Sequence, residues 1–369
     1  MTEMIAAEPA LAERLLHRLA DPASPAAELA AALAAVATGG GPIRLVGCGT
    51  SEHAAMAATL IVAEALRAAR LPWECVVARQ AFESWHDPGR ASGRGGLLVA
   101  VSHEGGTWAT NGALGAARDA GARTSIVTVG TGSPGAALAD IVIATGEQDQ
   151  SWCHTVGYLS PILAAVAVAA HLAGPGPERG AAGALVGAAA ALGGRAEPVA
   201  AALTGVDRIL VLGSGADRPA AHELALKLEE GTHLPATARD LETLLHGHLA
   251  AADSRTGVVL ILTDRSGRPE RLARARQVLA AAAALRMNRA AIIAAGVDAE
   301  LDPGLTPAGR LVVPEAPGLR PAAAALLATA PALQLLTERL ARARGTDPDT
   351  LRRTQRAYAE AGEAAEAAS

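Results

Sequence analysis

Residues 43–58, "IRLVGCGTSEHAAMAA", combine a run of β-forming residues, a turn that contains Gly47 and Gly49, and a segment of good helix formers. Residues 208–223, "RILVLGSGADRPAAHE", have the same order of features. A strand, a glycine turn and a helix in succession are typical of a parallel sheet covered by helices on both faces. The matching glycines, Gly47 and Gly213, lie 166 residues apart (213 − 47), which is a reasonable length for one domain. The two stretches therefore predict an α/β fold that is duplicated along the chain.

Further β-forming runs follow each of these stretches in matching order. Residues 97–107, "LLVAVSHEGGT", correspond to residues 258–268, "VVLILTDRSGR". We expect an N-terminal helical segment over residues 1–40, a first α/β domain over 41–190, a second over 200–345 and a C-terminal tail over 346–369. Each domain is expected to be a flavodoxin-like three-layer sandwich, with a parallel sheet between two layers of helices.

The composition disfavours several classes of partner. The 369 residues carry a net charge of −5 and show no basic stripe, so we expect no nucleic-acid partner. Cys48, Cys75 and Cys153 are widely spaced and match no metal-binding pattern, which indicates reduced thiols. The N-terminus lacks the features of a signal peptide, and the alanine-rich runs are too short or too interrupted to cross a bilayer. The sequence thus predicts a cytoplasmic protein without a membrane partner.

Two loops at the carboxyl ends of predicted strands carry hydroxyl groups. The first is "GCGTS", with Thr50 and Ser51, and the second is "SHEGGT", with Ser102 and Thr107. Loops at this edge of a parallel sheet line one crevice, and hydroxyls beside free helix N–H groups bind anions. The first loop is neither a dinucleotide fingerprint nor a P-loop. Helix capping explains the same residue types equally well for each hydroxyl taken singly.

Three charged residues share one face of the predicted helix that follows Gly213. Glu223, Lys227 and Glu230 are spaced i, i+4 and i+7. A solvated face with a helix salt bridge is the alternative interpretation. Downstream, "LLHGHLA" contains His246 and His248, and a histidine that titrates near neutrality suits proton transfer.

Together these residues resemble the sugar isomerase (SIS) domain family, in the double-SIS arrangement of the isomerase half of glucosamine-6-phosphate synthase. The resemblance rests on "GCGTS", "SHEGGT" and "ALKLEE", and it covers nearly the whole chain. It implies two tandem SIS domains, a sugar or sugar-phosphate ligand, a homodimer with a shared active site, and no cofactor or metal. No glutaminase domain precedes the first SIS domain, so release of ammonia from glutamine is not expected.

The resemblance also implies roles for individual residues. Glu230 corresponds to the family's enolisation base, and His246, sixteen residues after Glu230, to the ring-opening histidine that often comes from the neighbouring subunit. Lys227, one turn from Glu230, is expected to act as an electrostatic helper that stabilises the enediolate charge or sets the pKa of Glu230. The C-terminal tail is expected to contribute to the active site. The implied substrate-binding residues are Gly49, Thr50, Ser51, Ser102, His103, Glu104, Thr107, His154, Thr155, Glu223 and Arg356.

Several positions depart from the family pattern. Arg356 stands where the synthase has a lysine, and an arginine forms no Schiff base in practice. Glu104 replaces a phosphate-binding serine, and a carboxylate beside a phosphate in a poorly solvated pocket is unfavourable. Three interpretations stay open: Glu104 points away, it is protonated or paired with an arginine, or the substrate lacks a phosphate there. Isomerisation, deamination and cleavage of a sugar–amine adduct also stay open, with a non-catalytic sugar-binding regulator as the alternative class.

Overall fold

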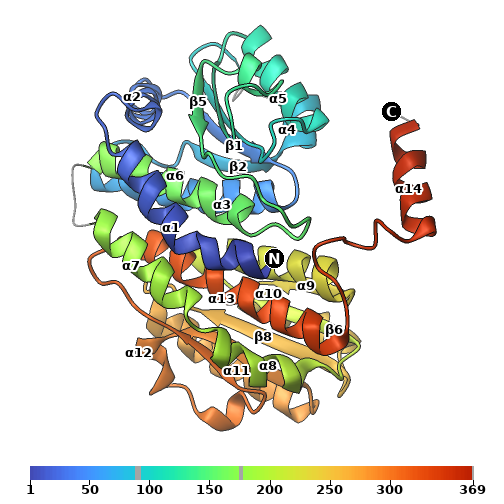
Figure 1. Cartoon of the computed structure of the whole chain (residues 1–369). Coiled ribbons are helices and arrows are strands. Elements are labelled where there is room, and N and C mark those ends of the chain that lie inside the picture. Colours follow the sequence, from blue (N-terminus) through green and yellow to red (C-terminus); the bar gives the residue numbers. More distant parts are fainter. Residues whose placement is uncertain (88–92, 174–177, 368–369) are drawn as a thin grey trace.

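The computed structural model describes residues 1–87, 93–173 and 178–367, and within them the chain forms two five-stranded parallel sheets (Figure 1). The strand order in the first sheet is β2-β1-β3-β4-β5. Its strands are β1 (Ile43–Gly47), β2 (Val76–Gln80), β3 (Leu97–Val101), β4 (Arg123–Thr128) and β5 (Ile141–Ala144). The register is direct, with Ile43 opposite both Val76 and Leu97.

The second sheet repeats this topology. Its order is β10-β9-β8-β6-β7, so that the first strand again lies between the second and the third. The strands are β6 (Arg208–Leu212), β7 (Ala236–Arg239), β8 (Thr256–Leu262), β9 (Asn288–Ala294) and β10 (Arg310–Val313). The predicted fold, an α/β protein with two parallel-sheet units, is confirmed.

Helices cover the faces of both sheets. In the first half these are α1 (Thr2–Leu19), α2 (Pro25–Thr38), α3 (Thr50–Ala68), α4 (Ala81–His86), α5 (Trp108–Asp119) and α6 (Val156–Ala173). The second half contains α7 (Glu178–Ala190), α8 (Gly193–Leu203), α9 (Arg218–Thr232), α10 (Leu241–Leu244), α11 (Arg268–Ala284), α12 (Ala295–Asp298), α13 (Pro321–Arg344) and α14 (Arg356–Ala367). Short 3₁₀ turns occupy Ala136–Leu138, Gly215–Asp217, His248–Ala251 and Pro303–Leu305.

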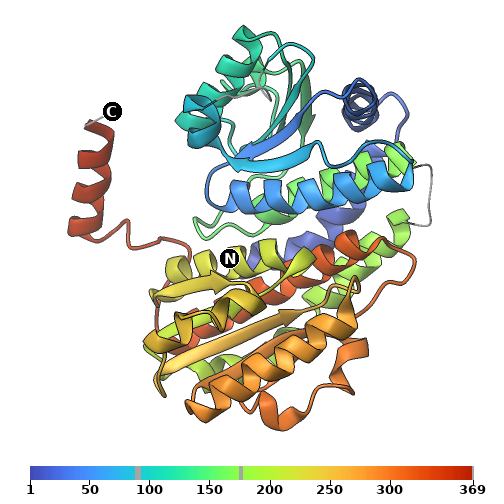
Figure 2. The same cartoon turned by 180° about the vertical axis from the view of Figure 1, so that it is seen from behind.

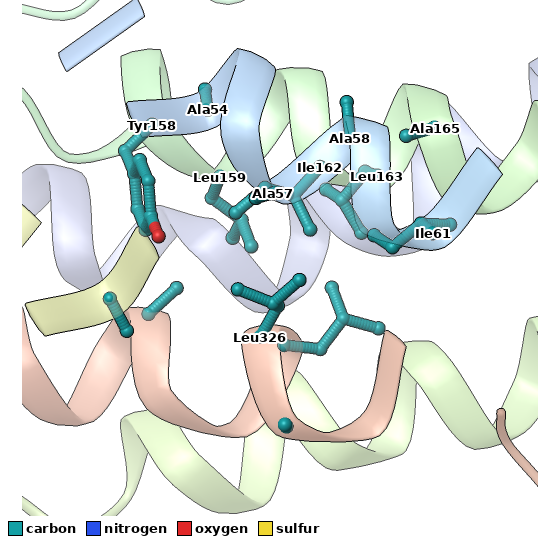
Figure 3. Packing of buried hydrophobic residues seen from close by; sticks show 14 of the residues in the cluster. Ala54, Ala57, Ala58, Ile61, Tyr158, Leu159, Ile162, Leu163, Ala165 and Leu326 are labelled. Atoms are coloured by element: carbon teal, nitrogen blue, oxygen red, sulfur yellow. The ribbon is translucent and has the colours of Figure 1, made fainter. Parts of the chain in front are cut away.

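A layer of helices fills the space between the two sheets. Seen from behind, α3 and α9 lie side by side in this layer (Figure 2). Ala54, Ala57 and Ala58 on α3 are buried where α3 packs against α6, and Leu326 of α13 lies below them (Figure 3). Small side chains let helix axes approach closely, which is how a chain poor in aromatic residues reaches a dense core.

One helix of the described residues, α6 (Val156–Ala173), is long and apolar enough to cross a membrane by length and composition. The protein itself buries 83% of this helix. Its apolar character is therefore explained by its place in the layer between the sheets.

The C-terminal helix α14 stands away from the rest of the chain in both views (Figures 1 and 2). A segment without helix or strand, residues 345–355, connects it to α13. Because the side chains of α14 are mostly exposed, packing against the core adds little to the stability of this helix. The connecting segment, in contrast, contacts the rest of the chain through Asp349 and Arg353.

Candidate active site

The centre of the candidate site is Glu223, a carboxylate with no exposed surface. Thr50 at the start of α3 donates its hydroxyl to Glu223 Oε1 at 3.2 Å, and His53 Nδ1 lies 2.7 Å from Glu223 Oε2. Glu223 thus joins α9 of the second half to α3 of the first half, each the helix that follows the first strand of its sheet. The contact requires a tight turn before α3, which Gly49 provides with a φ of +57°.

Lys227 lies one turn further along α9 and is fully buried as well. Its Nζ is 2.5 Å from Glu230 Oε2 and 3.6 Å from Glu223 Oε1. Burial acts to lower the pKa of Lys227, but the carboxylates of Glu223 and Glu230 outweigh it and raise the pKa, so the ammonium stays charged. Burial likewise acts to raise the pKa of Glu223, but Lys227 and His53 bring it below its usual value.

Glu230 differs from the other two members of this cluster because its side chain is 21% exposed. It therefore combines access to a ligand with a hydrogen bond to a buried cation. This arrangement can move a proton and can stabilise negative charge that develops nearby. The alternative interpretation of a solvated helix face is wrong, since Glu223 and Lys227 have no exposed surface.

The hydroxyl loops of the first half lie close to this cluster. Leu226 of α9 is 3.8 Å from the point where a Cβ on Gly49 would lie. Thr50 is committed to Glu223, whereas Ser51 is half-buried and Ser102 donates to the hydroxyl of Thr107 at 3.3 Å. Thr107 is the N-cap residue of α5 and Gly49 that of α3, but neither helix has a side-chain cap hydrogen bond. Capping therefore does not account for these hydroxyls.

Glu104 is exposed on the second loop. Its Oε1 accepts a hydrogen bond from Gln148 Nε2 at 3.1 Å. Among the described residues it has no arginine in ion-pair contact, so pairing with an arginine does not explain the replacement. The carboxylate is satisfied by a neutral amide at the surface.

His103 of this loop lies beside a second histidine, His154. The rings of His103 and His154 have centroids 4.9 Å apart, and the Nε2 of His103 accepts the backbone N–H of Asp149 at 2.9 Å. Burial and the neighbouring His154 lower the pKa of His103 to about 4. His103 is therefore neutral at pH 7, with its proton on Nδ1.

Asp149 orders the segment that carries these groups. Its carboxylate accepts the backbone N–H of Ser151, Thr155 and Gly157 at 3.2, 2.6 and 3.1 Å, the last two at the start of α6. Thr155 is fully buried, and its carbonyl accepts from Gln334, so Thr155 has a structural role in this chain. Asp149 was not among the residues predicted from the sequence, although a carboxylate shortly before an apolar helix is a recognisable signal.

The neutral state of His103 predicts a specific acid sensitivity. The unfolded histidine binds its proton near pH 6.5 and the folded one only near pH 4, so this group stabilises the fold above pH 6.5 and its contribution is lost as the pH falls towards 4. The loss between pH 7 and pH 4.5 is expected to be about 2 kcal/mol. Urea unfolding of the wild type and of His103→Gln, whose amide oxygen can still accept from Asp149, measures it. Equal pH slopes for the two proteins would contradict the assignment.

The structure does not bring His246 or Arg356 to Glu230 within one chain. The side chain of His246 is 69% exposed, with Nε2 at 2.8 Å from Glu242 Oε1 on the same helical segment. Arg356 is 91% exposed and pairs with Glu360 on α14. The contribution of His246 from a neighbouring subunit stays a prediction.

Residues that the sequence analysis missed complete the cluster. His53 contacts Glu223, the thiol of Cys153 lies 3.9 Å from the carbonyl of Lys227, and Tyr158 is fully buried in the same layer. Spacing does not mark His53 or Cys153, because their partners are 170 and 74 positions away in the chain. No cluster of three or more potential metal ligands occurs among the described residues.

The equivalent loops of the second half are filled by their own carboxylates. Asp217 accepts from the backbone N–H and the hydroxyl of Thr263 and from the N–H of Asp264. Asp264 in turn accepts from the N–H of Ala216 and Ser266. Burial raises the pKa of Asp217 to about 6. Because these carboxylates already accept from the N–H groups of their loops, these two loops of the second half do not offer the N–H donors that an anion would need.

Comparison with protein families matches residues 202–295 to the SIS domain. The isomerizing glutamine–fructose-6-phosphate aminotransferase of Symbiobacterium thermophilum is 30% identical over 238 residues, which cover 60% of this chain and 37% of the relative. The matched region thus spans little more than a third of that curated relative.

Solved structures agree over almost the whole chain. The C-terminal domain of glucosamine-fructose-6-phosphate aminotransferase from Francisella tularensis has a TM-score of 0.79 at 21% identity, covering 94% of this chain and 96% of that one. Tagatose-6-phosphate ketose/aldose isomerase from Escherichia coli has a TM-score of 0.72 at 19% identity, covering 95% and 94%. At these identities the structural likeness establishes the fold.

Proposed function

We propose that this chain, whose residues 202–295 match the SIS domain, is an enzyme that interconverts the aldose and ketose forms of a sugar, an amino sugar or a sugar phosphate. The observation that carries the proposal is the contact between Glu230, which reaches solvent, and the buried ammonium of Lys227. We also propose that the protein is a cytoplasmic homodimer, and that each subunit has a first domain over residues 41–190 and a second over residues 200–345.

The chemistry follows from the positions of these groups. Once the sugar ring is open, the Glu230 carboxylate removes the proton from the carbon beside the carbonyl group, and the electron pair moves onto the carbonyl oxygen as an enediolate. Lys227 Nζ stabilises this negative charge, because the ammonium group lies 2.5 Å from the Glu230 carboxylate and is therefore close to the reacting carbons. The hydroxyl proton of the enediolate passes to the former carbonyl oxygen, and Glu230 returns the carbon-bound proton to the former carbonyl carbon. The second oxygen then forms the new carbonyl group, so atoms and charge balance. His246 of a second copy is proposed to move the ring hydroxyl proton.

A phosphate at the far end of the sugar would meet Ser51, Ser102 and Thr107 with the free N–H groups at the start of α5. Glu104 lies on the same loop with its carboxylate bound to Gln148, which leaves these donors in place. Isomerising deamination of an amino sugar falls within the proposal, because it passes through the same proton transfer.

Hydrogen exchange in deuterated water at the carbon beside the carbonyl group, which is C2 of an aldose and C1 of a ketose, tests the proposal. Fructose 6-phosphate, glucosamine 6-phosphate and their unphosphorylated forms are the probes, and a thermal shift identifies which of them bind. We expect deuterium at C2 of each aldose and at C1 of each ketose that binds. Binding that raises the melting temperature without any exchange would contradict an enzyme and support a sugar-binding regulator. A larger thermal shift with the phosphorylated member of each pair is expected from the loop donors.

A further inference from the structure

A groove of about 460 Å³ opens at the carboxyl end of α9, directly beside Glu230. We propose that it binds an anionic group, a carboxylate or a phosphate, attached at the reacting end of the sugar, with Arg352 and His233 as its recognition residues. The inference rests on the proposed function in one respect, namely that Glu230 marks the reacting carbons. The groove is lined by Glu229, Glu230, His233, Leu234, Pro235, Leu351, Arg352 and Tyr358.

The two carboxylates of the groove already have partners. Glu229 Oε1 accepts the backbone N–H of Ala236 at 3.2 Å, and Glu230 binds Lys227. Arg352, in contrast, has no carboxylate within 4.0 Å among the residues that the structure describes. Its Nη1 donates to the hydroxyl of Tyr358, and its Nε is buried without an acceptor. A guanidinium with unused donors recognises a planar or tetrahedral oxyanion well.

His233 adds a second unsatisfied group to this wall. It ends α9 in the left-handed conformation, with φ at +58°, and its Nε2 is buried without a hydrogen-bond partner in the described part of the chain. Burial and the nearby guanidinium groups of Arg352 and Arg344 lower the pKa of this imidazole. A negatively charged ligand would offset the repulsion between these groups and supply an acceptor.

The connecting segment before α14 holds Arg352 in place. The guanidinium of the next residue, Arg353, lies 3.6 Å from the centre of the Trp152 ring, and the backbone N–H of Trp152 donates to the backbone carbonyl of Asp349 at 3.4 Å. The Asp349 carboxylate in turn binds the amino group of Met1. The chain therefore positions Arg352 at the groove, while Arg356 faces solvent on α14.

The place of the groove along α9 indicates which end of the sugar it would meet. The first-half loop contacts α9 at Glu223 through Thr50, and Glu230 follows seven residues later, about 10 Å along the helix. The groove begins at Glu229 and extends beyond the end of the helix. A sugar whose far end lies at the first-half loops would therefore present a substituent on its first carbons to Arg352.

Matched ligands test the inference by isothermal titration calorimetry. One pair is N-(1-deoxyfructosyl)glycine and its glycinamide, which differ in a carboxylate, and the other is fructose 1-phosphate and fructose, which differ in a phosphate. We expect the wild type to prefer an anionic member about 10- to 100-fold, with the preferred pair identifying the group. Arg352→Gln should abolish that preference and leave the affinity for the neutral member unchanged. Arg255→Gln, which removes an exposed charge paired with Asp207, is the matched control.

The outcomes separate this inference from the proposed function. Binding of the neutral sugars without preference for either anion would overturn the anion site and leave the isomerase proposal standing. Retention of the preference in Arg352→Gln, or its loss in Arg356→Gln alone, would also overturn it. Failure of all sugars to bind would overturn both proposals. Because the neutral ligand reports on folding of each variant, a misfolded Arg352→Gln would be recognised by loss of both affinities.

Discussion

Replacement of Glu230 by glutamine is expected to slow proton exchange at C2 of a bound aldose, or at C1 of a bound ketose, by about 10²- to 10⁴-fold. The amide has nearly the same shape and its oxygen can still accept from Lys227 Nζ, so the geometry is kept while the proton acceptor is lost. Mass spectrometry or NMR of the recovered sugar measures deuterium incorporation. The melting temperature is expected to change little, because Glu230 is partly exposed and Lys227 keeps its contact with Glu223.

Glu229→Gln is the matched control for this experiment. Glu229 is the neighbouring acid on α9, and its interaction is with the backbone N–H of Ala236, which an amide oxygen can also accept. Exchange in this variant is expected to stay close to the wild-type rate. Full exchange in Glu230→Gln would rule out Glu230 as the base, whereas equal losses in both variants would show that the end of the helix had been disturbed.

Replacement of Lys227 by methionine is expected to destabilise the fold by about 3–5 kcal/mol. The substitution leaves the fully buried carboxylate of Glu223 without its ammonium partner, and the remaining contacts from Thr50 and His53 compensate only in part. Denaturant unfolding monitored by circular dichroism measures the loss. Activity should fall together with stability, since the charge beside Glu230 is removed as well.

The double variant Glu223→Gln with Lys227→Met tests the cause of this loss. With both charges removed, no unpaired ion is left in the layer between the sheets, so the double variant should be more stable than the sum of the two single losses predicts. The coupling is expected to be about 1–3 kcal/mol. Additive losses would show that Lys227 stabilises the fold through packing of its methylene groups instead of through its charge.

The local pattern of the sequence determined much of the fold. Each β-run in residues 43–58 and 208–223 ends in a glycine turn and a helix, and short-range sterics and helix propensity decide those features without help from distant residues. The i, i+4, i+7 spacing likewise placed Glu223, Lys227 and Glu230 on one face of α9. The match between the two halves was also visible, because duplicated segments keep the order of their elements.

Only the tertiary structure decided which of these faces is buried and what it meets. Glu223 binds Thr50 and His53, which are about 170 positions away, and Arg352 reaches the groove at Glu230 through a segment with no regular structure. A helical spacing predicts which side chains are neighbours on one helix but not whether another helix covers them. The packing of other elements against α9 keeps Lys227 charged and leaves Glu230 as the accessible carboxylate of the buried cluster. It also leaves Arg352 at the groove without a carboxylate partner among the described residues. The reason is that burial and opposite charge act over distances in space and not along the chain.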